Sequence, residues 1–456
     1  MPVRFSLVVL LVSLLAAPAH AAVATPEPAT EQALLRDIAA SVSPAELHAT
    51  IGKLVSFGTR HTLSDTQSET RGIGAARRWV QARFAGLSKD CGNCLDVITP
   101  SQVATGPRIP QPTEVMDIVA VQRGGADAKR VILITGHLDS RVSDIMDATS
   151  DAPGANDDGS GVAAVIEAAR VLSKHKFRAT LVYGVLSGEE QGLYGGKVLA
   201  DYARAQGWQV EADLNNDIMG NSHGQDGVND NSTVRVFSEG TKALETTAQA
   251  NRRRYNGGEV DSPSRNIARY MAALAERYLT NLRVELVYRT DRYGRGGDQV
   301  PFLEAGFPAV RVTEAHEDYT RQHQDVRVED GVRYGDTIEG VDFAYLAQVT
   351  RLNLLTLAAM ANAPAPPTGV AIEGAVTPNT IVKWQVEPGT AGYRVWWRGT
   401  TEAQWQHSRH VRADAPDAGK LVLQNIVIDD WFFGVAAVSA EGYESPVVFA
   451  GEAGAF

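Results

Sequence analysis

The feature that most constrains the fold of this 456-residue chain is an alternation of apolar strands and amphipathic helices between Met116 and Ala361. Its first clear strand, Val131-Ile132-Leu133-Ile134, is a continuous apolar run of the kind that is buried on both faces. Such alternation predicts a three-layer α/β domain, in which a central, mostly parallel mixed sheet carries helices on both faces. Two helices are expected between residues 44 and 87, strands at 180–186, 210–218, 234–237, 284–288 and 309–312, and helices at 161–172, 193–205, 242–251, 267–278 and 342–361.

The sequence changes in character after residue 362. Residues 363–367 form a proline-rich linker. From 368 to 456, short segments rich in Val, Ile, Trp and Tyr are separated by turn residues, which predicts an all-β sandwich. The positions of Trp384, Tyr393 and the segment after Phe433 resemble a fibronectin type III module.

Residues 1–21 have the form of a signal peptide. Arg4 precedes the apolar run 7–16, and Ala19-His20-Ala21 has the small-x-small pattern of a cleavage site. A membrane anchor is disfavoured because the run is shorter than the roughly 18 residues that a span requires. We therefore expect an exported chain, periplasmic or secreted, with no stable membrane insertion of its mature form. The net charge of -11 argues against a nucleic-acid partner.

The only two cysteines, Cys91 and Cys94, lie in the sequence CGNC. In an oxidising compartment this spacing favours a local disulfide, which would rigidify a turn. A redox-active pair is less favoured, since the motif does not open a helix after a buried strand, and a zinc site lacks further cysteines.

Five residues of types that bind divalent metals stand at or beside the ends of the predicted strands. Because the carboxyl ends of parallel strands meet at one edge of a sheet, these side chains are expected to lie together. Two imidazoles and three carboxylates, one of them able to bridge, are a full ligand set for two zinc ions. The five are His137, Asp157, Glu190, Asp217 and His323.

The first two of these residues have informative neighbours. Asp139 follows His137 by two positions and can accept the second ring N–H, which would fix the imidazole for metal binding. Asp157 and Asp158 are adjacent in a Gly-rich turn before a predicted helix. A helix cap explains one of these aspartates but not both.

The remaining residues each have a structural alternative. Consecutive Glu189 and Glu190 are common at an exposed helix start, but after a third βα unit they predict a metal ligand, Glu190, and a general base, Glu189. Asp217 could equally form a turn at a strand end. His323 is preferred because Asp325 gives it the same spacing as His137 and Asp139, with His316 and then His223 as its rivals.

Together these motifs resemble the exported dizinc aminopeptidases of the leucyl aminopeptidase type, a family related to glutamate carboxypeptidase and the transferrin receptor. The resemblance rests on GHLDS, PGANDDGSG, SGEEQGLYGG, Asn215 to Asp217, and DYTRQHQD, and it covers about residues 35 to 360. It implies that Asp157 bridges two Zn²⁺ ions, with His137 and Asp217 at one and Glu190 and His323 at the other. It also implies a cis peptide between Asp157 and Asp158.

The expected function follows from the resemblance and from the charge of the ligand set. Residues 22–362 would form a zinc peptidase domain that removes N-terminal residues from peptide substrates. A hydroxide held by two Zn²⁺ ions would attack the peptide carbonyl, while Glu189 takes and returns the proton. Tyr293 or Tyr319 could assist the oxyanion. A carboxypeptidase or dipeptidase would use the same site with an arginine for the substrate carboxylate, for which Arg292, Arg295 and Arg321 are candidates. A catalytically inactive, receptor-like binding protein is disfavoured because every ligand and the base are present.

Overall fold

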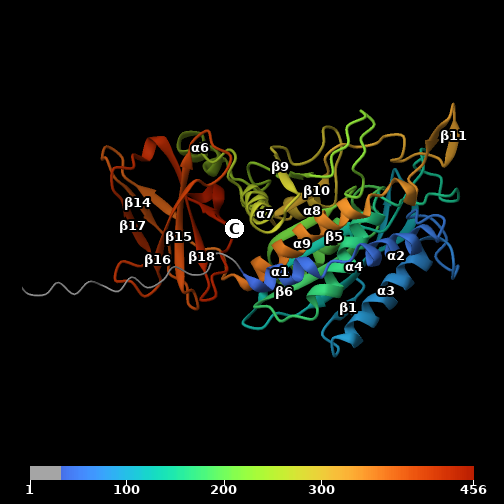
Figure 1. Cartoon of the computed structure of the whole chain (residues 1–456), viewed down its shortest axis with the longest axis horizontal. Helices are drawn as coiled ribbons and strands as arrows, with labels where there is room; N and C mark the ends of the chain where they lie inside the picture. The colour runs from blue at the N-terminus through green and yellow to red at the C-terminus, as the bar shows by residue number, and fades with distance from the viewer. Residues whose placement is uncertain (1–31) are drawn as a thin grey trace, which may run out of the picture.

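The structure is a computed structural model that describes residues 32–456, so the predicted signal peptide lies outside the described residues. Figure 1 shows two parts side by side, an α/β domain and a smaller β domain formed by the end of the chain. The C-terminus lies where the two parts meet (Figure 1). Within residues 32–456, no helix combines the length and apolarity that a membrane crossing requires.

The α/β domain is built on an eight-stranded sheet with the order β1-β4-β6-β5-β7-β10-β8-β9. Four of its seven strand pairings are parallel, which makes it a mixed, mostly parallel sheet. The predicted fold class is therefore confirmed. The strands are β1 (Asp96–Ile98), β4 (Ile118–Gln122), β5 (Asp127–His137), β6 (Ala179–Leu186), β7 (Gln209–Asn216), β8 (Thr233–Phe237), β9 (Arg283–Val287) and β10 (Ala309–Glu314).

Helices cover both faces of this sheet, because each central strand is apolar on both sides. Ile132 and Ile134 of β5 pack in the larger core with α1–α4, α7 and α9. Val131 and Leu133 point to the opposite face, where they pack with α5 and α8. The helices are α1 (Ala33–Ala40), α2 (Pro44–Val55), α3 (Gly72–Asp90), α4 (Gly159–Leu172), α5 (Tyr194–Ala205), α6 (Thr247–Asn256), α7 (Pro263–Tyr278), α8 (Gln299–Glu304) and α9 (Phe343–Asn362).

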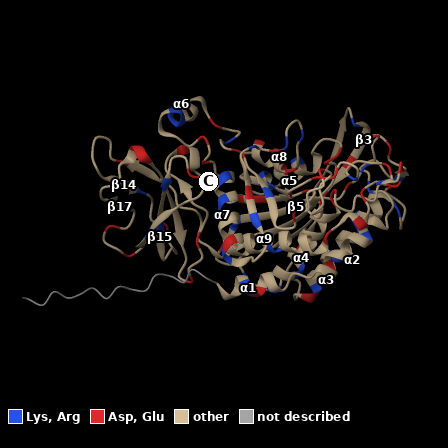
Figure 2. Ribbon diagram, turned by 45° about the horizontal axis from the view of Figure 1, so that its top comes forward, with Lys and Arg blue, Asp and Glu red and all other residues tan. Residues whose placement is uncertain are grey.

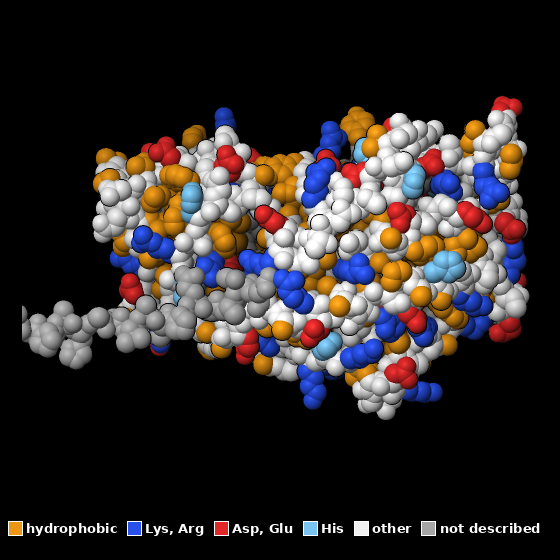
Figure 3. Space-filling model, in the orientation of Figure 1, with side chains coloured by type: hydrophobic (Ala, Val, Ile, Leu, Met, Phe, Trp, Pro, Cys, Tyr) orange, Lys and Arg blue, Asp and Glu red, His pale blue; other side chains and the backbone are white. Residues whose placement is uncertain are grey.

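Two antiparallel hairpins project from the domain, β2 (Ser101–Gly106) with β3 (Ile109–Met116) and β11 (Arg327–Glu329) with β12 (Val332–Tyr334). Cys91 and Cys94 form a disulfide just after α3, as expected. On the face shown in Figure 3, acidic and basic side chains are interspersed among apolar ones.

Helix α6 differs from its prediction at 242–251. It begins at Thr247, because the Thr246 hydroxyl accepts a hydrogen bond from the Gln249 amide and the Gln249 side chain accepts one from the Thr246 amide. This reciprocal capping box fixes the start of the helix, and the prediction from apolar spacing alone overlooked it.

The C-terminal domain consists of two antiparallel sheets. One contains β13 (Ala371–Glu373), β14 (Thr380–Lys383) and β17 (Lys420–Leu423), and the other contains β15 (Gly392–Gly399), β16 (His407–Arg412), β18 (Trp431–Val438) and β19 (Val448–Phe449). Side chains from both sheets, among them Trp384, Tyr393 and Phe433, form one shared core. This is the predicted β-sandwich.

A buried ion pair joins the sandwich to the segment just before helix α7 of the α/β domain. Arg398 of β15 donates to both carboxylate oxygens of Asp261, at 2.8 and 2.9 Å, and Arg269 of α7 donates to the same carboxylate at 2.8 Å. All three side chains are fully buried. Basic residues on α7 can be seen beside the sandwich in Figure 2. The two domains therefore share a desolvated contact and not only a linker.

Candidate metal centre

The five predicted metal ligands come together at the carboxyl edge of the central sheet. His137 is the last residue of β5, and Asp217 follows the end of β7. Asp157 and Glu190 lie in the turns before α4 and α5, and His323 lies in the loop after β10. They form two groups, which share Asp157: an inner group with His137 and Asp217, and an outer group with Glu190 and His323.

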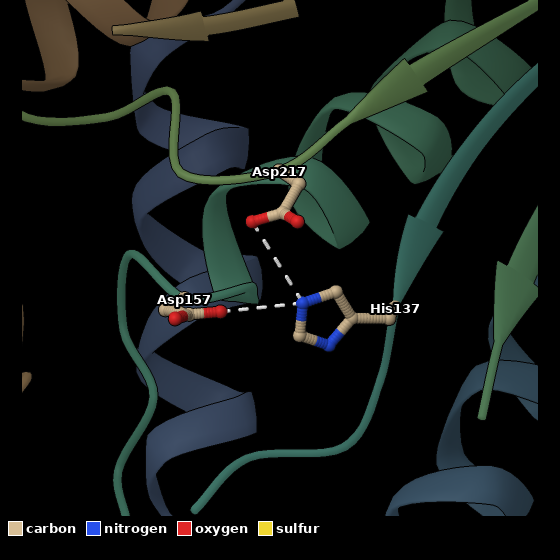
Figure 4. A group of neighbouring side chains, drawn as sticks. All are labelled: His137, Asp157 and Asp217. Atoms are coloured by element: carbon tan, nitrogen blue, oxygen red, sulfur yellow. Dashed lines mark ion pairs between the residues drawn. The ribbon is translucent and has the colours of Figure 1, made fainter. Parts of the chain in front are cut away.

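The inner group is drawn in Figure 4. Nε2 of His137 lies 3.2 Å from Oδ1 of Asp157 and 3.9 Å from Oδ1 of Asp217. In the outer group, Nε2 of His323 lies 3.0 Å from Oδ2 of Asp157 and 3.1 Å from Oε1 of Glu190. Asp157 thus directs one carboxylate oxygen to each group, as a bridging ligand must.

The residues fit divalent metal ions. Nε2 of His137, Oε1 of Glu190 and Oδ1 of Asp217 are buried and have no hydrogen-bond partner in the described part of the chain. Buried polar atoms without partners are costly, and a cation within each group would satisfy them. Bonds of about 2.0–2.2 Å in a tetrahedral site place ligand atoms roughly 3.3 to 3.6 Å apart, close to the observed separations of 3.0 to 3.9 Å.

The tautomer of His137 is set by the backbone of Asp139. The Nδ1 atom of His137 lies 3.0 Å from the carbonyl oxygen of Asp139. Because a carbonyl can only accept, the proton is on Nδ1 and the Nε2 lone pair faces the inner group. The Asp139 carboxylate, expected to make this contact, is 3.7 Å away. That expectation is corrected: the carbonyl group holds the imidazole.

The Asp139 carboxylate holds a different loop. It accepts hydrogen bonds from the amides of Gly188 at 2.9 Å and Glu190 at 3.1 Å, and from the Thr62 hydroxyl at 2.9 Å. Because these amides belong to the turn that carries Glu189 and Glu190, Asp139 fixes the positions of the predicted base and of one predicted ligand.

Asp158 fixes two further elements. Its carboxylate caps α4 by accepting from the Gly161 amide at 2.9 Å, and it accepts from the His137 amide at 2.9 Å. A Cβ atom at position 161 would lie 2.4 Å from Oδ2 of Asp158, so this close approach requires glycine. The peptide bond between Asp157 and Asp158 is cis.

Glu189 lies beside both groups without belonging to either. It lines a cavity of about 400 Å³ together with Asp157, Asp217 and His323. No residue that the structure describes donates a hydrogen bond to its carboxylate. Burial and the nearby carboxylate of Glu190 raise the pKa of Glu189 well above its ordinary value. This environment suits a group that must accept a proton and return it.

Comparison with known proteins places the chain in a family. Residues 117–330 match the model described as peptidase family M28. A "Probable zinc metalloprotease" of Leptosphaeria maculans is 44% identical over 93% of this chain and 97% of its own length. One of Pyrenophora tritici-repentis is 43% identical over 93% of this chain and 88% of its own length. The chain belongs to peptidase family M28.

Solved structures share the fold of this M28 chain. "The crystal structure of Legionella pneumophila LapA aminopeptidase" has a TM-score of 0.52 at 20% identity, covering 73% of this chain and 76% of that one. A leucine aminopeptidase precursor from Bacteroides thetaiotaomicron has a TM-score of 0.50 at 15% identity, covering 69% and 97%. At these identities the likeness concerns the fold alone.

The rivals of His323 lie elsewhere in the M28 chain. Nδ1 of His316 lies 2.9 Å from the Asp226 carboxylate, and His223 contacts the Ser222 hydroxyl. The reason given for preferring His323 was wrong, however. Asp325 accepts a hydrogen bond from the Ser143 amide, and within residues 32–456 it forms no hydrogen bond or ion pair with the His323 ring.

The tyrosines suggested for the oxyanion are exposed, and neither Tyr293 nor Tyr319 lines the cavity. Glycines and Leu193 line it between the charged residues. The expectation for both tyrosines is therefore not supported by their positions.

Sequence reasoning missed two buried residues that support the metal ligands. The Asp336 carboxylate accepts from the amides of Asn156 at 2.9 Å and Asp157 at 2.7 Å, which holds the bridging aspartate in place. Burial raises the pKa of Asp336 to about 7. Arg60 binds the carbonyl oxygens of Leu138 at 2.7 Å and Gly154 at 2.9 Å, so it ties together two ligand-bearing loops. Neither residue lies in a recognisable motif.

Arg311 of β10 was also missed. Its Nη1 atom lies 2.7 Å from Oδ2 of Asp217, and its side chain is 0% exposed. Although burial alone would raise the pKa of Asp217, the guanidinium of Arg311 and the ring of His137 hold that pKa well below its ordinary value. Asp217 is therefore kept as a carboxylate, the form that can bind a cation. An arginine inside the apolar run 309–312 was the only available signal.

Proposed function

We propose that this chain is a zinc-dependent exopeptidase, an aminopeptidase that hydrolyses N-terminal residues from peptides with Glu189 as its general base. The observation that carries the proposal is the position of Asp157, which gives one oxygen to each of two ligand groups, with Glu189 beside both. The names of the fungal relatives support zinc as the metal. The motifs shared with dizinc aminopeptidases support two ions and a free N-terminus.

Each residue has a distinct part in this proposal. His137, Asp157 and Asp217 would hold one Zn²⁺ ion, and Asp157, Glu190 and His323 the other. Bound zinc polarises the peptide carbonyl and makes water more acidic. The Glu189 carboxylate accepts the proton of the attacking water and delivers it to the departing amine. Asp139 keeps that carboxylate in position through the backbone of the same turn.

The substitution Glu189→Gln tests the proposed base. It removes the proton acceptor but none of the five ligands, so hydrolysis should fall about a thousandfold while the zinc content is unchanged. Turnover of aminoacyl chromogenic substrates and the zinc-to-protein ratio are both measured. Glu285→Gln, at an exposed position of β9, is the matched control. Retention of activity in Glu189→Gln would refute the assigned role.

Blocked peptides separate an aminopeptidase from a carboxypeptidase. An aminopeptidase should cleave a peptide with a free amine and an amidated C-terminus, and should lose activity when the amine is acetylated. Cleavage of a second peptide, with an acetylated amine and a free C-terminal carboxylate, would instead establish a carboxypeptidase. The zinc-to-protein ratio tests the number of ions, since a value that never exceeds one would contradict the two-ion proposal.

The proposal extends to the export of the chain and to its second domain. The pattern of residues 1–21 and the Cys91–Cys94 disulfide support export to an oxidising compartment. N-terminal sequencing of the exported protein should give Ala22 as the first residue, and recovery of an uncleaved chain from the cytoplasm would contradict this. The sequence of the sandwich supports its relation to fibronectin type III modules.

A further inference from the structure

Arginines surround the cavity that contains the two ligand groups. Its lining includes Arg108, Arg141, Arg292 and Arg295, which we call the arginine cluster. The cavity, at about 400 Å³, has the size of a small-ligand site. The positive charge of each guanidinium group weakens the binding of a cation in this cavity. The presence of four such groups therefore needs a physical explanation.

On the side of the inner group, three arginines share one carboxylate. The carboxylate of Glu317 lies 2.9 Å from Nη1 of Arg295, 3.4 Å from Nη1 of Arg292 and 2.7 Å from Nη2 of Arg235. One buried carboxylate therefore faces three guanidinium groups. Arg292 also contacts Asp291, at 3.3 Å. Each guanidinium has five N–H donors, so donors remain for a further anion.

On the side of the outer group, Arg141 has even fewer partners. Its Nε atom lies 3.5 Å from Oε2 of Glu190, and its side chain is 16% exposed. Within the described residues this buried Nε atom has no hydrogen-bond acceptor. Arg108, in the turn between β2 and β3, donates to the carbonyl oxygen of Glu190 at 2.9 Å. Guanidinium groups thus flank the outer group as they flank the inner one.

Offsetting the ligand carboxylates does not account for the whole cluster. Arg311 already provides this at Asp217, from a fully buried position. Arg295 contacts Glu317 and Gln322 and none of the five predicted ligands. Once divalent ions neutralise the ligand carboxylates, Arg108 and Arg141 have no remaining carboxylate partner within residues 32–456, and Arg292 and Arg295 still share Glu317 with Arg235.

We propose that the arginine cluster binds a carboxylate of the substrate, so that the preferred substrates are short peptides with an anionic group within about two residues of the scissile bond. This inference rests on the proposed function, since it names the substrates of the same site. Two extended residues span at most about 7 Å. Nη2 of Arg292 lies 3.9 Å from Oδ2 of Asp217, so the cluster is within such a reach of the metal ligands. The planar guanidinium fork matches a carboxylate.

Three substrates identify the source of the carboxylate. They are leucyl-alanine with a free C-terminus, its C-terminal amide, and the amide of leucyl-aspartate. If the C-terminal carboxylate is bound, kcat/KM of the free dipeptide should exceed that of its amide by about tenfold or more. If an acidic side chain is bound, kcat/KM of the leucyl-aspartate amide should exceed that of the leucyl-alanine amide by the same factor. The difference should arise in KM and should shrink at high salt concentration.

Arg295→Met and Arg141→Met test the cluster itself. Each removes a guanidinium but keeps an unbranched apolar side chain, and each should reduce the preference for the anionic substrate by about tenfold. Arg123→Met is the matched control, because Arg123 is exposed and pairs with Asp96 away from the cavity. Zinc content is measured in every variant, since loss of metal would lower turnover of all three substrates alike.

Dipeptide binding can be measured with the Glu189→Gln variant, so that the test of the arginine cluster does not depend on turnover. Calorimetry should show tighter binding of an anionic dipeptide than of its uncharged counterpart, and loss of that difference with Arg295→Met. Equal affinity and equal kcat/KM for all three substrates would overturn the inference while leaving an aminopeptidase in place. Preferential binding of the anion without cleavage of any free-amine peptide would support the cluster and overturn the proposed function.

Discussion

The inner and outer ligand groups share Asp157 and have the same composition, one histidine and two carboxylates, but the protein holds them very differently. The side chains of His137 and Asp217 in the inner group are 1% and 3% exposed and stand at the ends of central strands. His323 of the outer group is 26% exposed and lies in a loop. We infer that the inner group is a rigid part of the sheet, whereas the outer group depends on a loop that must be ordered.

The substitution Asp157→Asn should have the largest effect on zinc binding and hydrolysis. Asp157 is the ligand that both groups share, so the loss of its charge should weaken both groups together. Both ions should bind more weakly, and hydrolysis should fall to the uncatalysed background. Elemental analysis after dialysis gives the zinc content. If one full equivalent of zinc remained tightly bound, Asp157 would not serve both groups.

Comparing His137→Ala with His323→Ala separates the two groups. Each should lower the zinc content by one ion. His137→Ala should also destabilise the metal-free chain by about 2 kcal/mol or more, because it leaves a cavity in a close-packed site. His323→Ala should change this stability by less than about 1 kcal/mol, since the ring is partly exposed. Urea unfolding with chelator measures both, and equal losses would contradict the inferred difference in rigidity.

Arg311→Met sharpens the comparison, because among the residues that the structure describes only the inner group has a fully buried arginine in contact with a ligand carboxylate. In the metal-free chain it should cost about 3 to 5 kcal/mol, as Asp217 would be a buried carboxylate without its partner. With zinc bound the loss should be smaller, since the metal then compensates the charge. Denaturation with and without chelator gives both values, with Arg123→Met as the control. An equal loss in both states would show that Arg311 does not act through charge.

The affinity of the outer group for zinc should depend on pH. Although burial lowers it, the carboxylates of Glu190 and Asp157 raise the pKa of His323 to about 10 in the metal-free chain. Protonated histidine cannot bind zinc, so the affinity of the outer group should fall about tenfold for each unit that pH decreases below that value. Zinc titrations between pH 6 and 8 measure this slope. An affinity independent of pH would contradict it.

The sequence was sufficient for those parts of the fold and site that depend on local order along the chain. The apolar run of β5 and the residues directly after the strand ends led to the sheet and to His137, Glu190 and Asp217. The supporting residues could not be predicted in this way. Asp336 is 179 positions from Asp157, whose amide it binds, and Arg311 is 94 positions from Asp217. Only the folded chain makes such pairs neighbours.

The role of Asp139 shows a second limit of sequence reasoning. Its spacing from His137 correctly indicated contact, but spacing does not distinguish a carbonyl oxygen from a carboxylate of the same residue. The choice depends on where the turn after β5 directs the side chain, and here it directs the carboxylate to the amides of Gly188 and Glu190. The same limit applied to Asp325, whose spacing from His323 led to a false pairing.

The contact of Asp261 with Arg398 and Arg269 restricts how such a chain can evolve. Exchange of the sandwich for an unrelated module by recombination would remove Arg398 and leave the Asp261 carboxylate buried with one partner fewer. The loss of one partner from a buried ion pair is strongly destabilising. A viable exchange would need a compensating change at Asp261 in the same step, so the two domains should be inherited as a single unit.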